Sequence, residues 1–158
     1  MKQIAVFIIL SIIISSCSIL YMPSSTDCIN KDAYHFYKLA YKQENKGSLD
    51  SALYYFNKAD QADPDNPKIL HARGLAKYKI SYVKRHDPKY FNTNINYEDA
   101  ITDLNKAIEL ETNSKLLHKS YYPNRALVFL EMGEMDNACS DWKIADERYY
   151  LRKYCNKK

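Results

Sequence analysis

Cysteine and histidine are the side chains of this 158-residue chain that could act as nucleophiles, redox groups or metal ligands. They are Cys17, Cys28, Cys139 and Cys155, and His35, His71, His86 and His118. No cysteines form a Cys-x-x-Cys pair and the histidines are scattered, so the spacing predicts no metal site. The chain has only 3 glycines and lacks the common hydrolase, zinc-protease and phosphate-loop motifs. We therefore expect no cofactor, no small-molecule substrate and no enzymatic activity.

Cys17 follows a segment with the three parts of an export signal. Lys2 provides a positive start, residues 4–14 are almost wholly apolar, and two serines precede the cysteine. The segment Ile14-Ser15-Ser16-Cys17 resembles the lipobox of bacterial lipoprotein signal peptides. The resemblance implies cleavage before Cys17, a diacylglycerol on its sulfur and usually a further acyl chain on the new amino terminus. We expect residues 1–16 to be the signal peptide of a protein exported to the bacterial cell envelope and anchored to a membrane by lipid.

Two other interpretations of the leader are weaker. An uncleaved transmembrane anchor needs about 20 apolar residues, and the run over residues 4–14 is shorter. An ordinary cleaved signal would leave Cys17 as a structural cysteine, but its place directly after the small residues favours the lipobox. Residues 17–31 contain Pro23 and several serines, which indicates a flexible tether.

Charge gives little indication of a nucleic-acid partner. The net charge is +4, and basic residues are interspersed with acidic ones, so the chain lacks the concentrated positive charge that nucleic-acid binding requires. The run Lys84-Arg85-His86 is a local exception. Because charge runs are usually solvated, we expect it to lie in a surface loop.

Small residues recur at matching intervals along the rest of the chain. Ala40 and Ala52 are separated by the same interval as Ala126 and Ala138, whereas Gly74 and Ala100 lie more than twice as far apart. Two antiparallel helices can approach closely where such side chains meet. Large residues would fill the space between the hairpins: Phe36, Phe56, Leu104, Tyr122 and Trp142. Gly47 and Gly133 are suited to end the first helix of their hairpins, and Pro64 is suited to end the second helix of the first hairpin.

This order of residues resembles the tetratricopeptide repeat (TPR) family, whose period is about 34 residues. The resemblance covers residues 32–147 and implies an all-α fold, an α-α superhelix of about three helical hairpins. The expected repeats are 32–66, 67–114 and 115–147; an insertion near 81–94 would lengthen a helix and then form a loop. Two departures are Arg73-Gly74 and Arg125-Ala126, which replace the leucine–small pair of the family.

A solenoid of this type needs a terminal element to cover its last apolar face. Residues 148–158 are expected to form this C-terminal capping helix and tail, with Tyr150, Leu151 and Tyr154 toward the last hairpin. If Cys17 is lipidated, an odd number of cysteines remains, and Cys28 is either free or paired. Cys139 and Cys155 would then form a disulfide that staples the cap, or remain as two buried thiols.

The first helices of stacked TPR hairpins line a concave face, which predicts a groove for a protein or peptide partner. The expected groove residues are Tyr34, Tyr37, Tyr41, His71, Leu75, Tyr78, Leu127 and Leu130. Tyrosine rings lose little entropy on binding and suit an extended peptide or a helix. Some TPR domains grip a C-terminal carboxylate through Lys and Asn, but Tyr37, Tyr41 and Ala72 occupy those places here. The sequence thus does not support a carboxylate grip of that type.

Three functions follow from this reasoning. The favoured one is a membrane-anchored adaptor that assembles or steadies an envelope complex. The alternative is a structural envelope lipoprotein or surface antigen without a dedicated partner. A cryptic enzyme is the third, and a cleft with paired carboxylates or a Cys–His contact would be needed to support it.

Overall fold

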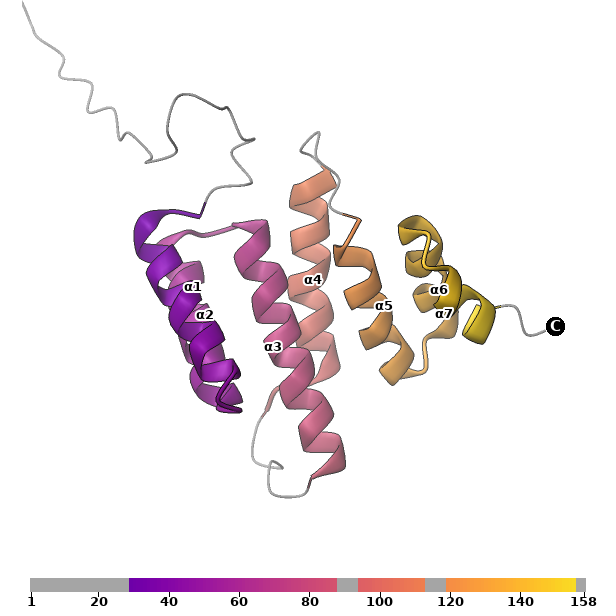
Figure 1. Cartoon of the computed structure of the whole chain (residues 1–158), viewed down its shortest axis with the longest axis horizontal. Coiled ribbons are helices and arrows are strands. Elements are labelled where there is room, and N and C mark those ends of the chain that lie inside the picture. The colour runs from indigo at the N-terminus through magenta and orange to yellow at the C-terminus, as the bar shows by residue number, and fades with distance from the viewer. Residues whose placement is uncertain (1–28, 88–93, 113–118, 156–158) are drawn as a thin grey trace, which may run out of the picture.

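The computed structural model describes residues 29–87, 94–112 and 119–155, and within these the chain forms helices and their connections (Figure 1). The helices are α1 (Lys31–Glu44), α2 (Leu49–Ala62), α3 (Pro67–His86), α4 (Tyr97–Thr112), α5 (Tyr121–Met132), α6 (Met135–Ala145) and α7 (Arg148–Tyr150), followed by a π-helical turn, η2 (Leu151–Cys155). The predictions for the leader and tether, including Cys17 and Cys28, lie outside the described residues.

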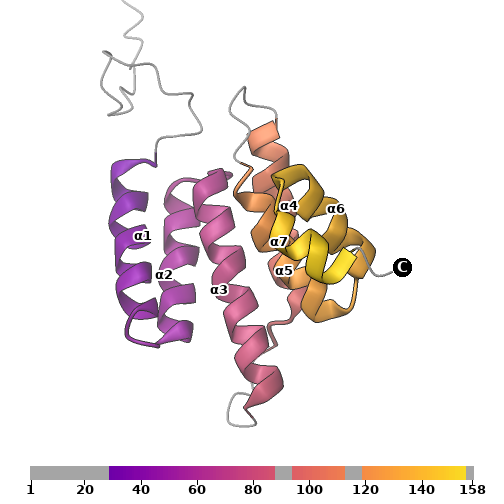
Figure 2. The same cartoon turned by 45° about the vertical axis from the view of Figure 1, so that its right-hand side comes forward.

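The six longer helices pack as three hairpins, α1–α2, α3–α4 and α5–α6. Figures 1 and 2 show the hairpins side by side in chain order, with the C-terminal segment against the last of them. Adjacent hairpins are joined by packing of α2 on α3 and of α4 on α5. The predicted all-α architecture of stacked hairpins is therefore confirmed.

Small residues lie where the helices of each hairpin meet. Ala40 and Ala52 are fully buried in one core cluster with Phe56, and Ala126 and Ala138 share another with Trp142. These contacts allow the paired helices to approach closely, as their spacing predicted.

Gly74 marks a close approach of the two helices of the second hairpin. A Cβ at this position would lie 2.9 Å from Leu104 Cγ and 3.2 Å from the Ala100 carbonyl oxygen. The glycine is therefore required by the distance between α3 and α4.

The helix ends follow the predicted turn chemistry. Gly47 and Gly133 have φ angles of 76° and 81°, in the left-handed region that glycine adopts without strain. The last residue of α2 lies just before Asp63-Pro64. Asn30 begins α1 by accepting hydrogen bonds from the backbone N–H groups of Asp32 and Ala33, which satisfies two of the free donors at the helix start.

The run Lys84-Arg85-His86 is helical, so the prediction of a surface loop was wrong. These residues form the last turn of α3, which has 20 residues against 14 in α1. Positive charge is favourable at a helix C-terminus because of the helix dipole. Arg85 Nη1 also donates a hydrogen bond to the Glu131 carbonyl oxygen of α5 at 2.7 Å. α3 is thus longer than α1, while residues 88–93 of the expected insertion lie outside the described part.

Arg73 and Arg125, which stand where the TPR pattern has leucine, each form an ion pair within their own hairpin. Arg73 Nε and Nη2 donate to both carboxylate oxygens of Asp103 at 2.7 and 2.8 Å, and Nη1 donates to Asp60 of the preceding hairpin at 2.6 Å. Arg125 repeats this pattern. Its Nε and Nη2 donate to both carboxylate oxygens of Asp141 at 2.8 and 2.7 Å, and its Nη1 donates to Asn105 Oδ1 of the preceding hairpin at 2.7 Å. Each arginine thus ties its own hairpin together and joins it to the one before.

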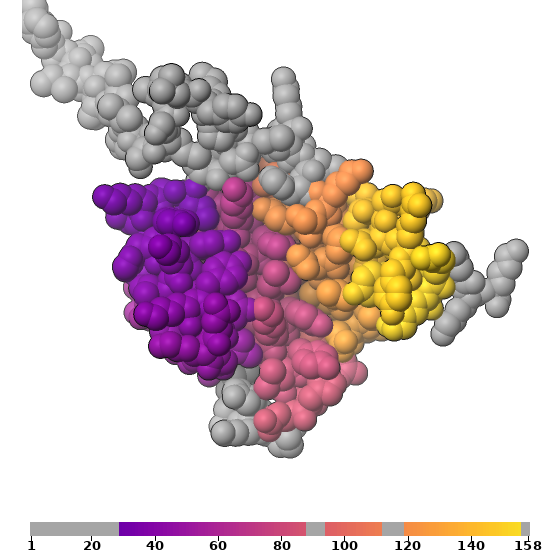
Figure 3. Space-filling model, in the orientation of Figure 1, coloured from indigo at the N-terminus to yellow at the C-terminus, as the bar shows by residue number. Residues whose placement is uncertain are grey.

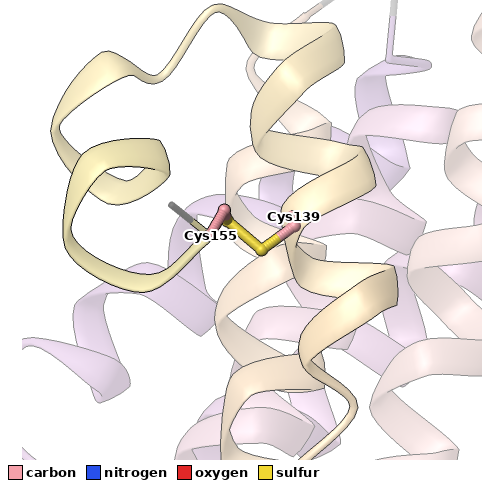
Figure 4. The surroundings of a disulfide bond; sticks show 2 residues. All are labelled: Cys139 and Cys155. Atoms are coloured by element: carbon pink, nitrogen blue, oxygen red, sulfur yellow. A yellow bond between two sulfur atoms is a disulfide. The ribbon is translucent and has the colours of Figure 1, made fainter. Parts of the chain in front are cut away.

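The C-terminal segment covers the end of the last hairpin. Trp142 is fully buried, and the rings of Tyr150 and Tyr154 stack on its indole with centroid distances of 4.9 and 5.6 Å. Cys139 of α6 and Cys155 of η2 form a disulfide, with their Cα atoms 5.8 Å apart (Figure 4). Of the two alternatives left open by the sequence, the structure contains the bridge and not a pair of thiols.

Candidate partner-binding groove

Three tyrosines of α1 line one pocket together, and α1 belongs to the indigo part of the surface in Figure 3. Their helical spacing places Tyr34, Tyr37 and Tyr41 on one face of the helix. Tyr34 and Tyr41 are 50% and 38% exposed, and Tyr37 is half-buried between them. These rings form the most open aromatic part of the predicted groove.

Phe56 of α2 holds two of these rings in place. The rings of Tyr37 and Tyr41 pack edge-on to each other at 4.9 Å and edge-on to Phe56 at 5.9 and 5.3 Å. The Tyr37 hydroxyl donates a hydrogen bond to the Tyr41 hydroxyl at 3.3 Å. Burial, and then this hydrogen bond, raise the pKa of Tyr41 well above its ordinary value. The phenol therefore stays uncharged and available for hydrogen bonding.

Two pockets open beside these tyrosines. One of about 550 Å³ is lined by residues of α1 and of the turn that follows it: Tyr34, Tyr37, Lys38, Tyr41, Lys42, Asn45 and Lys46. The other, of about 470 Å³, lies between α1 and the start of α3 and is lined by Ile29, Tyr34, Tyr37 and Lys68. The surface thus combines aromatic walls with a basic rim, which suits a chain that carries both apolar and acidic side chains.

His71 joins α3 to α5. Its ring stacks on Tyr121 with centroids 4.2 Å apart, and the Asn124 amide Nδ2 lies 2.9 Å from His71 Nε2. Burial lowers the pKa of His71 to about 4, so the ring is neutral at physiological pH. A neutral imidazole can accept the Asn124 hydrogen bond at Nε2 only if its own proton is on Nδ1. His71 is thus committed to the contact between hairpins.

The remaining predicted groove residues are half-buried and shared with the protein's own packing. Tyr78 lies 6.1 Å from the Tyr97 ring, and burial, followed by the charge of Glu131, raises the pKa of Tyr78 to about 12. Leu127 and Leu130 pack against the core of the third hairpin. Leu75 of α3 is also half-buried. The structure therefore brings the three α1 tyrosines together as an open surface and leaves the other five less accessible.

A further pocket, of about 620 Å³, lies where the ends of α3 and α5 meet the start of α4. Its lining has mixed charge: Arg85, His86, Tyr97, Glu98, Leu130, Glu131, Met132, Gly133 and Glu134.

The described residues bring no three His, Cys, Asp or Glu side chains together at a spacing suited to a metal ion. In that same part of the chain, no helix has the length and apolar character to span a membrane.

Sequence reasoning missed the basic rim of the groove and the partners of His71. Lys38, Lys42 and Lys46 follow one another at helical spacing next to the tyrosines, so the pattern that identified the tyrosines could have identified the rim. Tyr121 and Asn124 belong to another repeat, and their approach to His71 depends on how the hairpins stack. No local pattern signals such a contact.

Comparison with known proteins supports the fold and leaves the family open. No family model and no curated protein sequence matches the chain. Among solved structures, the chain is similar to the first TPR domain of Spaghetti (RPAP3) bound to an HSP90 peptide. The similarity has a TM-score of 0.57 and 20% sequence identity, and covers 80% of this chain and 84% of that chain. The chain therefore has a TPR-like all-α fold.

Proposed function

We propose that this protein is a membrane-anchored interaction scaffold that binds an extended segment of a protein partner on the face formed by α1, α3 and α5. The observation that carries this proposal is the open pocket among the α1 tyrosines, Tyr34, Tyr37 and Tyr41. Aromatic walls that carry hydroxyl groups favour a polypeptide ligand, because they offer both apolar contact and hydrogen bonds.

The similar TPR domain supports a peptide as the ligand, because that domain is bound to an HSP90 peptide. The contacts in this chain would have to differ from a carboxylate grip by Lys and Asn. Tyr37 and Tyr41 present phenols, and Ala72 is buried in the core with 2% of its surface exposed. We therefore expect binding through side chains along a segment rather than through a chain terminus.

The test is capture of a partner from crosslinked, intact envelopes with two matched variants. Tyr34→Ala with Tyr41→Ala changes the groove, whereas Tyr54→Ala with Tyr149→Ala removes two tyrosines that are 57% and 58% exposed and line none of the pockets described above. We expect a stoichiometric partner that the first variant loses and the second retains. Recovery of no such partner would support the structural lipoprotein or surface antigen instead.

The lipid anchor is tested separately. If Cys17 carries acyl chains, growth with a palmitate analogue should label the protein, and Cys17→Ala should abolish the label. Lipidation by two or more chains would also hold the protein on membranes through repeated washing. Continued labelling of Cys17→Ala would remove the anchor from the proposal and leave the groove unaffected.

A further inference from the structure

The α1 side of the groove carries three lysines along one exposed edge. Lys38, Lys42 and Lys46 are exposed and line the same pocket as the tyrosines. The ammonium group of Lys38 lies 5.6 Å from the centre of the Tyr34 ring. None of these three lysines is in an ion pair within the described part of the chain. Their charge is therefore available to a ligand in the pocket.

The nearby carboxylates do not neutralise this edge. Glu44 is half-buried and pairs with Lys79 of α3, and Asp32 lies in the first turn of α1, away from the pocket lining. The neutral His71 adds no charge at the centre of the face. Positive charge is thus concentrated on the outer edge of α1 and of the turn that follows it.

Charge is distributed differently on the second helices. α4 carries five carboxylates and a single lysine: Glu98, Asp99, Asp103, Glu109, Glu111 and Lys106. Of these, Asp103 is paired with Arg73 and Lys77 and Glu111 is buried, so Glu98 and Glu109 are the exposed carboxylates of α4. The unpaired lysines beside the α1 tyrosines can therefore attract and orient an acidic partner at the groove.

We infer that the α1 side of the groove binds an acidic segment of a partner polypeptide, with an apolar side chain among Tyr34, Tyr37 and Tyr41 and side-chain carboxylates toward Lys38, Lys42 and Lys46. This inference rests on the proposed function and names the class of segment. Because the lysines form a row, carboxylates spaced along the segment can be matched one by one, and an internal stretch of a protein suffices. Each exposed pair contributes little, so the lysines select among segments while the aromatic pocket provides contact area.

The experiment compares retention of three synthetic peptide pools on the immobilised full-length protein. The pools share the same randomised positions and have alternate positions fixed as Glu, Gln or Lys, with amidated C-termini that remove the terminal carboxylate. We expect the Glu pool to be retained about tenfold more than the Gln pool at low salt, since three weak pairs sum to about that factor. This excess should disappear at high salt.

Two charge-matched variants make the result specific. Lys38→Gln, Lys42→Gln and Lys46→Gln together should abolish the preference for the Glu pool. Lys58→Gln, Lys106→Gln and Lys143→Gln, on α2, α4 and α6, remove the same charge elsewhere and should leave it. Equal retention of all pools, lost only in Tyr34→Ala with Tyr41→Ala, would overturn the inference and preserve the proposed function. An unchanged Glu preference in the first lysine variant would also overturn the inference, and retention of no pool would contradict both.

Discussion

Arg125 and Asp141 show how one residue substitution is matched by another inside a repeat. The first hairpin has Leu39 and Tyr55 at the equivalent sequence positions, while the third has a bidentate ion pair with side-chain exposures of 19% and 3%. Removing one partner of such a pair leaves the other charge unpaired and partly desolvated. The arrangement therefore predicts strong coupling between the two positions.

We expect Asp141→Asn to lower the free energy of unfolding by about 2–3 kcal/mol, because Arg125 keeps some contact with water. The double variant Arg125→Leu with Asp141→Leu should cost less than the sum of its single variants. Urea unfolding of the unchanged protein, the two single leucine variants and the double variant measures this coupling. Strictly additive costs would mean that the interaction between the two side chains contributes nothing to stability.

The lowered pKa of His71 predicts that the stability of the protein depends on pH. The pKa of His71 is about 4 in the folded protein against 6.5 for a free histidine, so the unfolded chain takes up a proton at a pH where the folded chain does not. Stability from this group is fully present above pH 6.5 and is lost as the pH falls toward 4, by up to about 3 kcal/mol. Urea midpoints between these pH values should fall less in His71→Gln than in the unchanged protein. A His71 ring that titrates near its ordinary pKa by NMR would contradict this account.

Among the helices, α3 and α4 approach each other closely where Gly74 faces Leu104. Gly74→Ala would normally stabilise a helix by up to about 1 kcal/mol. Here its Cβ would meet Leu104 Cγ at 2.9 Å, and Leu104 is fully buried. We expect a net loss of about 1–2 kcal/mol, measured by thermal unfolding.

The control for this loss is the Leu104→Ala background. Leu104→Ala is destabilising in itself, but it removes the side-chain atoms that the new Cβ would meet and leaves the Ala100 carbonyl oxygen at 3.2 Å. Gly74→Ala should then cost clearly less than in the unchanged protein. The same loss in both backgrounds would show that helix contact is not the reason for the glycine.

The C-terminal cap depends on the Cys139–Cys155 disulfide and on stacking against Trp142. The disulfide closes a loop between residues with a sequence separation of 16. In the chain-entropy model, this closure stabilises the state in which the cap covers Trp142 by roughly 3 kcal/mol. Since Trp142 is the single tryptophan of the chain, its fluorescence reports directly on the cap. Reduction, or Cys155→Ser, should shift its emission to longer wavelength while the far-ultraviolet circular dichroism of the hairpins changes little. Unchanged emission would show that stacking alone holds the cap.

At the scale of the whole molecule, the features that the sequence predicted are those set by local spacing. Ala40 and Ala52 indicated a hairpin because close helix contact permits only small side chains there, and the positive φ of Gly47 follows from the same turn. The role of Arg73, by contrast, does not follow from local spacing, because its partner Asp103 is brought near only by folding. His71 was expected to face the groove, yet the stacking of α5 on α3 covers it with Tyr121.

A partner on the face of the α1 tyrosines is tested most directly by site-specific photo-crosslinking. A benzoylphenylalanine introduced at position 34 or 54 replaces tyrosines of similar exposure, 50% and 57%, on α1 and α2. In intact cells that produce the protein, irradiation should give a discrete crosslinked adduct from position 34 and none from position 54. Adducts from both positions alike, or from position 54 alone, would contradict the account.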